Sequence, residues 1–85
     1  MAHFALIDET NTVVEVITVG NENCGGGNFP ESEPIGQAFI ASCGIPGQWL
    51  QTSYNGNFRG LYAGISMKFL PNVGEYGVFA VIPNE

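Results

Sequence analysis

The stretch TVVEVITV, residues 12–19, decides the fold class of this chain. Seven of its eight residues branch at Cβ, and such residues favour extended strands over helices. Alternation divides the apolar side chains between two faces, with Val14 and Val16 on one and Val13, Ile17 and Val19 on the other. We therefore expect other parts of the protein to cover both faces of the sheet that contains this strand.

A second strand is predicted just before this stretch. AHFALI, residues 2–7, alternates with Phe4 and Leu6 on one face and with His3, Ala5 and Ile7 on the other. The linking residues DETN, 8–11, are typical of a turn, because Asp and Asn side chains bond to nearby backbone. The two strands and their four-residue loop predict a β-hairpin.

One short helix is predicted over SEPIGQAFIASCG, residues 32–44. Ser32 is expected to cap its N-terminus, and Gly44 is expected to end it, with Ile45 folding back on the last turn. Gly36 lowers helix stability by about 1 kcal/mol relative to alanine, so packing on the sheet must hold the helix. Helical spacing predicts a packed face made of Ile35, Ala38, Phe39 and Ser42.

The remaining segments indicate a loop and three more strands. Residues 20–32 contain three consecutive glycines and predict an irregular loop. Strands are expected over 48–54, over 65–69 and over 78–83, and the Asn-Gly pair at 55–56 predicts a hairpin turn after the first of them. The order β-β-α-β-β-β predicts an α+β fold. We expect a single domain, residues 1–85, with a mostly antiparallel sheet of about five strands packed on one helix.

Charged residues are scarce and mostly acidic. They make up 12% of the chain, about half of the typical ~25%. A net charge of −6 at pH 7 argues against nucleic acid and anionic membranes as partners. A surface with so few charges suits contact with other protein, so we expect a homo-oligomer or a larger assembly. The N-terminal residues lack the pattern of a signal peptide, and synthesis in a cytoplasm is expected.

No arrangement of residues typical of catalysis is visible in the sequence. His3 is interpreted as a packed strand histidine, and the acidic residues suit turns and a helix start. Cys24 and Cys43 are separated by 18 intervening residues and form no CxxC motif, so free thiols and a disulfide both stay open. We expect no enzymatic activity, no metal and no cofactor.

The stretch SYNGNFRG, residues 53–60, holds Arg59, one of only two basic residues. Its guanidinium could pair with a carboxylate on a partner, or it could brace an acid of its own chain such as Asp8 or Glu31. The aromatic side chains nearby could anchor a partner or pack on the sheet. The candidate partner-binding residues are Tyr54, Phe58, Arg59 and Tyr62.

Three stretches resemble a family of small proteins from tailed bacteriophages, especially cyanophages. They are MAHFALIDETNTVVEVITVGNENC (1–24), ESEPIGQAF (31–39) and WLQTSYNGNFRGLYAGI (49–65). The similarity covers residues 1–40 and 48–69. After Gly64 the chain departs from the family, in which Tyr-Asp and a Pro-rich, Trp-terminated tail are usual, so contacts of the C-terminal part with a partner could differ.

The resemblance implies a structural virion protein, most of all a capsid decoration (cement) protein that binds and stabilises the shell. It implies the major capsid protein as partner and synthesis in the host cytoplasm before incorporation into the virion. Acidic charge could steer such a protein to a basic patch on the shell, and many equivalent weak contacts could hold it there. The family supplies no catalytic residues.

Three other functions stay open at this point. Similar segments occur as modules of longer tail proteins, so a tail or receptor-binding accessory is the first. The second is an early phage protein that inhibits a host enzyme, a role that an acidic surface would suit. The third is a thiol enzyme that uses Cys24.

Overall fold

The computed structural model describes residues 1–81 of the chain. Its elements are β1 (Ala2–Ile7), β2 (Val13–Val19), the 3-10 helix η1 (Asn21–Cys24), α1 (Ser32–Ser42), β3 (Gln48–Thr52), β4 (Lys68–Leu70) and β5 (Val78–Ala80). The α+β class is confirmed, and the strands and α1 follow the predicted order. The strands form two antiparallel sheets rather than one, with the orders β2-β1-β3 and β4-β5.

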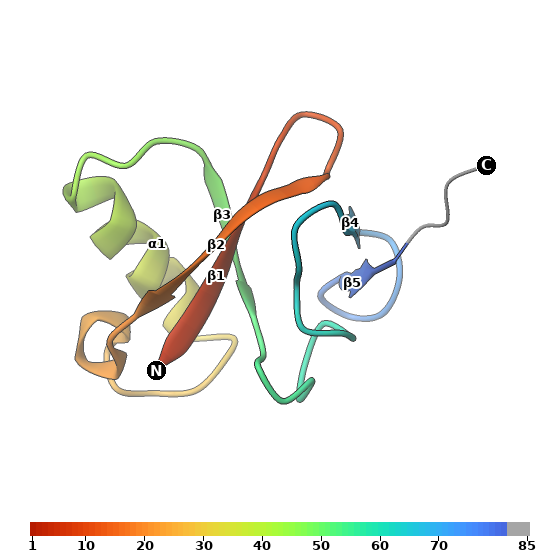
Figure 1. Cartoon of the computed structure of the whole chain (residues 1–85). Coiled ribbons are helices and arrows are strands. Elements are labelled where there is room, and N and C mark those ends of the chain that lie inside the picture. The colour runs from red at the N-terminus through yellow and green to blue at the C-terminus, as the bar shows by residue number, and fades with distance from the viewer. Residues whose placement is uncertain (82–85) are drawn as a thin grey trace.

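The three-stranded sheet lies between two covering layers (Figure 1). On one face it packs against α1 and η1, and on the other it packs against the β4–β5 pair and the segment leading to it. The core on the helix side contains Ala2, Phe4, Val19, Cys24, Ile40 and Trp49. The core on the β4–β5 side contains Ala5, Ile7, Val13, Leu50, Ala63, Phe69 and Phe79. Both faces are covered, as the two apolar faces of the second strand predicted.

The side-chain alternation of β1 is as predicted, but that of β2 is broken near its start. Leu6 pairs with Glu15, whereas the next residue, Ile7, pairs with Val13, so the register shifts between them. Alternation predicted that Val13 and Ile17 share a face. Val13 instead packs in the core on the β4–β5 side, whereas Ile17 packs on the helix side. An extra residue in one strand moves the side chains beyond it to the opposite face of the sheet. Sequence alternation with a strict period of two does not reveal such a bulge.

The C-terminus of α1 forms the predicted glycine-ended turn. Gly44 has φ of 78°, and its N–H donates to Ala41 O at 3.0 Å. The Ile45 N–H donates to Ile40 O at 3.4 Å. These two bonds define a Schellman motif, which needs a residue that tolerates positive φ.

The N-terminus of α1 differs from the prediction. Ser32 is already the first helical residue, Glu31 occupies the N-cap position, and no side chain caps the helix. The Ser32 hydroxyl donates instead to Gln51 Oε1 of β3 at 2.7 Å. A buried long-range hydrogen bond therefore takes the place of the local cap.

The packed face of α1 was predicted only in part, since Phe39 of the predicted face packs against the core but Ala38 and Ser42 are exposed. Its buried residues are Ser32, Gly36 and Ile40, whereas Ile35 of the predicted face is 47% exposed. A Cβ at Gly36 would lie only 2.8 Å from Phe4 Cε1 and 2.9 Å from Cys24 Sγ. The helix therefore approaches β1 so closely that glycine is required at the contact.

The glycine-rich segment 20–32 is not wholly irregular. It contains η1, closed by a hydrogen bond from Asn23 N–H to Gly20 O at 2.9 Å. Cys24, at the end of η1, is buried under α1. This buried anchor holds one turn of helix beside glycines that by themselves would favour disorder.

The chain turns after β3, but the predicted hairpin does not form. β3 ends at Thr52, and Gly56, with φ of 70°, donates its N–H to Ser53 O at 3.1 Å in a tight turn. Arg59 and Gly60 then both adopt positive φ, 58° and 72°. They turn the chain toward β5, where Gly60 forms an isolated bridge, instead of back along β3.

The last two strands are shorter than predicted. β4 begins at Lys68 rather than at 65, because Ser66 lies in a turn with φ of 78°. β5 ends at Ala80, and the predicted extension to residues 82 and 83 lies outside the described residues. No helix among residues 1–81 is long and apolar enough to cross a membrane.

Candidate functional site

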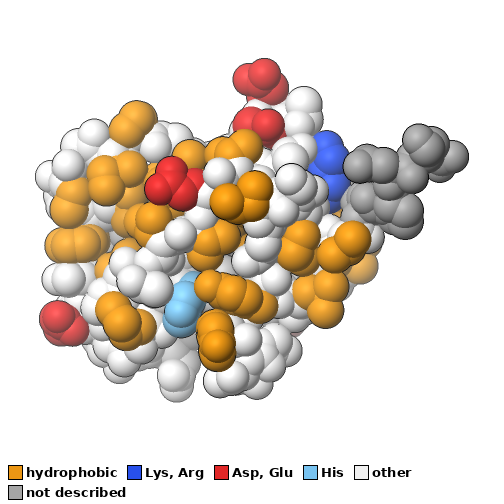
Figure 2. Space-filling model, in the orientation of Figure 1, with side chains coloured by type: hydrophobic (Ala, Val, Ile, Leu, Met, Phe, Trp, Pro, Cys, Tyr) orange, Lys and Arg blue, Asp and Glu red, His pale blue; other side chains and the backbone are white. Residues whose placement is uncertain are grey.

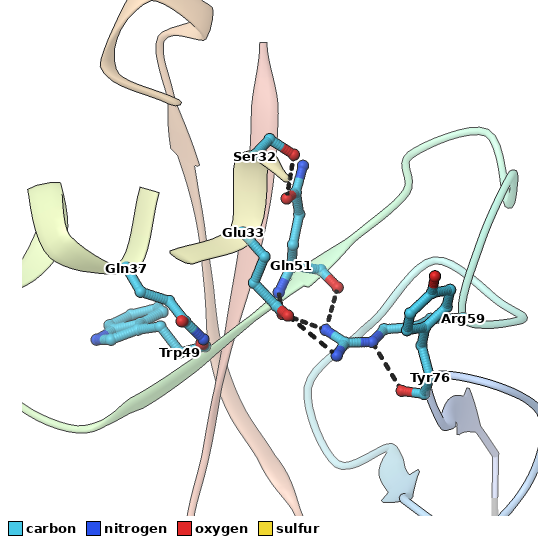
Figure 3. A network of polar contacts seen from close by, with 7 residues as sticks. All are labelled: Ser32, Glu33, Gln37, Trp49, Gln51, Arg59 and Tyr76. Atoms are coloured by element: carbon cyan, nitrogen blue, oxygen red, sulfur yellow. Dashed lines mark hydrogen bonds and ion pairs between the residues drawn. The ribbon is translucent and has the colours of Figure 1, made fainter. Parts of the chain in front are cut away.

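Arg59 lies at the centre of a polar network (Figure 3). Its side chain is only 8% exposed and forms an ion pair with Glu33 of α1, through Nη1 and, at 3.2 Å, through Nη2. Nη1 also donates to Gln51 O of β3 at 3.0 Å. Nε donates to Tyr76 O at 3.0 Å. The guanidinium therefore joins α1, β3 and the loop before β5.

Of the two roles considered for Arg59, the structure shows bracing within the chain. The acid is Glu33, however, and neither Asp8 nor Glu31 as predicted. Asp8 accepts hydrogen bonds from Thr10 and Thr12 within its own turn. These bonds lower the pKa of Asp8, and the bond from the Thr10 hydroxyl contributes more than those from the backbone N–H groups. A partner contact of Arg59 stays a prediction, and its burial leaves little of the side chain accessible.

The same network closes the free edge of β3. Gln51 N–H donates to Glu33 Oε2 at 2.8 Å, and Gln51 O accepts from Arg59. Trp49 O accepts from Gln37 Nε2 at 2.6 Å. An open strand edge invites pairing with another chain. Side chains from α1 and Arg59 therefore oppose strand addition at this edge.

Phe58 belongs to a group of aromatic rings around the guanidinium. The Arg59 Cζ atom lies 5.0 Å from the centre of the Phe29 ring and 5.3 Å from that of Phe69. Phe58 stacks on Phe29, with 4.0 Å between ring centres and 1° between planes. Tyr76 meets Phe29 edge-on at 4.9 Å. Cation–π contacts of this kind add to the stability of the ion pair.

The other two candidate residues, Tyr54 and Tyr62, form a separate ring cluster with His3. The ring of His3 stacks on Tyr54 and meets Tyr62 edge-on, both at 5.5 Å between centres. The two tyrosine rings are 5.1 Å apart. Tyr54 is 66% exposed, and the other two rings are partly buried. The structure therefore brings two of the four candidates together at the surface, and the sequence did not associate them with His3.

The segment that carries Tyr62 also contains exposed hydrophobic side chains. Leu61 and Ile65, from the same segment as Tyr62, are both more than half exposed. Figure 2 shows orange side chains, a class that includes tyrosine, beside the pale-blue histidine, while the acidic side chains in this view lie above it and at the left edge. Burial, and then the nearby N-terminal amine, lowers the pKa of His3. The imidazole therefore adds little charge to this surface at neutral pH.

The environment of Cys24, the cysteine considered as a nucleophile, disfavours its reactive form. Cys24 is buried, and burial, with a further contribution from Glu22, raises the pKa of its thiol. A raised pKa disfavours the thiolate, which is the reactive form. Cys43 is exposed, and both cysteines are free thiols. Among residues 1–81, no three His, Cys, Asp or Glu side chains gather in a way that could hold a metal ion.

Comparison with family models, with curated protein sequences and with solved structures finds no match for this chain. The resemblance to phage virion proteins therefore stays a prediction from the sequence.

Proposed function

We propose that this chain is a structural protein that binds other protein subunits through the ring cluster and the exposed hydrophobic side chains of the segment that carries Tyr62. The observation that carries the proposal is the surface cluster of His3, Tyr54 and Tyr62, in which Tyr54 is the exposed member. Tyrosine and other large side chains are enriched among the residues that dominate binding energy at protein interfaces. The proposed contact also includes Leu61 and Ile65, which are exposed in the segment that carries Tyr62.

The distribution of charge supports an acidic protein that meets a basic partner. The chain has eight acidic and only two basic residues. Both basic side chains are engaged within the chain, Arg59 with Glu33 and Lys68 with the Thr12 hydroxyl at 2.7 Å. The rest of the surface is therefore dominated by negative charge, which would speed association with a basic rim on the partner.

We further propose, from the resemblance to phage decoration proteins, that the partner is the capsid shell. The chain would bind the major capsid protein in many copies, as a homo-oligomer, and stabilise the shell as part of the virion. Many equivalent sites make modest affinity at each site sufficient, because the lattice holds all of them together.

The test is co-sedimentation of the purified chain with shells assembled from the major capsid protein of the same phage. Tyr54→Ser and Tyr62→Ser should each weaken binding at least tenfold, which corresponds to about 1.4 kcal/mol. Tyr76→Ser is the matched control, because Tyr76 is an exposed tyrosine outside the ring cluster. Shell binding that is insensitive to Tyr54 and Tyr62, in variants whose circular dichroism is unchanged, would refute the proposed surface.

A further inference from the structure

A second aromatic surface lies outside the ring cluster. It is a pocket of about 460 Å³ lined by Asn28, Phe29, Pro30, Asn57, Phe58 and Tyr76. The volume falls within the roughly 300–1,000 Å³ that is usual for small-molecule sites. None of its lining residues belongs to the surface proposed for subunit binding, so the pocket is open to a separate role.

The aromatic walls of the pocket are held in place before a ligand binds. Phe29 and Phe58 stack with their planes parallel to within 1°. Arg59 packs over the Phe29 ring, and its guanidinium is fixed in turn by Glu33 and by Tyr76 O. A preorganised wall lowers the entropy cost of binding. The bracing network therefore also shapes this pocket.

The chemistry of the lining favours a neutral ligand. None of the lining residues is charged, and the guanidinium of Arg59 beside Phe29 is already paired with Glu33, so a charged ligand would find no free counter-charge there. Asn28 and Asn57 each carry an amide with both donor and acceptor groups. A purely apolar ligand would make no use of these amides, whose residues are exposed in the free chain. A ring that bears hydroxyl groups meets both requirements, since its C–H face can pack on an aromatic ring while its hydroxyls bond to the amides.

We propose that this pocket binds a neutral saccharide, with Phe58 packing on a sugar ring and Asn28 and Asn57 hydrogen-bonding its hydroxyls. A proline-rich peptide is the nearest competitor, because aromatic grooves also bind such segments. Proline has no backbone N–H, however, so such a segment offers fewer donors to the amide oxygens of the two asparagines than a sugar ring does. Sugar hydroxyls donate and accept, so they satisfy both ends of each amide.

The experiment is an NMR titration of the ¹⁵N-labelled full chain with maltotriose, cellotriose and triacetylchitotriose. At least one of these saccharides should shift the side-chain amide signals of Asn28 and Asn57 to saturation, with a dissociation constant on the order of 1 mM. Asn57→Ala should weaken that binding at least tenfold. This variant keeps the backbone bond from residue 57 to Ser53 Oγ, at 2.9 Å, so it tests the amide with little risk to the turn.

Two further variants make the result specific. Phe58→Ala should also weaken binding of the saccharide, whereas Tyr54→Ala, which alters the ring cluster, should leave the affinity for the saccharide unchanged. The absence of saturable shifts with all of these saccharides would overturn the proposal, as would an Asn57→Ala variant that binds like the unaltered chain. Saturation by a proline-rich peptide alone would overturn it in favour of a peptide site. Because the ring cluster takes no part in this assay, its outcome is independent of shell binding.

Discussion

Replacing Arg59 by methionine tests the polar network that joins the two sides of the molecule. Methionine keeps a long apolar side chain but removes the guanidinium, which donates to Glu33, Gln51 O and Tyr76 O. The Glu33 carboxylate, whose side chain is only 16% exposed, would then retain the Gln51 N–H as its donor at 2.8 Å. The variant therefore leaves a largely buried charge without its counter-charge.

The expected loss of stability is large for a domain of this size. Removing one partner of a buried ion pair costs about 3–5 kcal/mol. Glu33 keeps some contact with water, so we expect about 3 kcal/mol, at the lower end of that range. The total free energy of unfolding for 85 residues, at about 0.05–0.15 kcal/mol per residue, is about 4–13 kcal/mol. Arg59→Met should therefore remove a substantial part of it.

Urea unfolding followed by fluorescence of Trp49 measures this loss, since Trp49 is the only tryptophan and is buried in the core. Lys68→Met is the matched control, because it removes the other basic residue with the same change in net charge. Lys68 bonds Thr12 Oγ1 and Thr10 O at the edge of the molecule, and its loss should cost less than about 1 kcal/mol.

A double-mutant cycle with Glu33→Gln isolates the interaction energy between Arg59 and Glu33. Arg59→Met combined with Glu33→Gln should cost less than the sum of the single variants, with a coupling of about 0.5–3 kcal/mol. The reasoning is refuted if the two single effects simply add. It is equally refuted if Arg59→Met costs no more than Lys68→Met.

Three other perturbations have defined outcomes. Gly36→Ala should lower the free energy of unfolding in urea by about 1–3 kcal/mol, because the added methyl group overpacks the contact with β1 even though alanine favours helix. The control Ala38→Gly, at an exposed helix position, should lower it by only about 1 kcal/mol through helix propensity. A Gly36→Ala variant that is more stable than the unaltered chain would contradict the close approach of α1 to β1. Since the pKa of His3 is lowered by folding, the unfolded chain takes up this proton first, and stability should fall as pH drops below 6.5 toward the folded-state pKa. The stability of His3→Phe, measured by urea unfolding as a function of pH, should lack the part of this loss that is due to His3. Identical pH profiles for the variant and the unaltered chain would exclude a contribution of His3. Ellman's reagent should modify Cys43 in the native protein and Cys24 only after unfolding; rapid reaction of both thiols would contradict the burial of Cys24.

Local patterns predicted the elements whose stability is itself local. The strands 2–7 and 12–19 and the glycine-ended turn at Gly44 follow from β-branching, alternation and positive φ, and the structure confirms them. The N-terminal end of the helix was predicted less well. Ser32 had a local role available as a cap, but it bonds a side chain of β3 that lies 19 residues away in the sequence.

The features that sequence reasoning missed depend on contacts between distant segments. The buried face of α1 is set by the approach of Phe4 to Gly36, and amphipathic spacing contains no information on that approach. The partner of Arg59 is 26 residues away, and several acids were equally plausible by chemistry alone. The sequence did place Tyr54 and Tyr62 among the surface candidates, but only the fold of β1 brings His3 to them.

Assembly onto a phage shell is tested most directly by the copy number of this chain in purified virions. Quantitative mass spectrometry against the major capsid protein measures it. We predict a ratio near one copy per shell subunit, or a simple fraction of that ratio. A handful of copies per particle would indicate a tail accessory instead. Absence from virions would contradict the virion role and favour a protein that acts on a host enzyme.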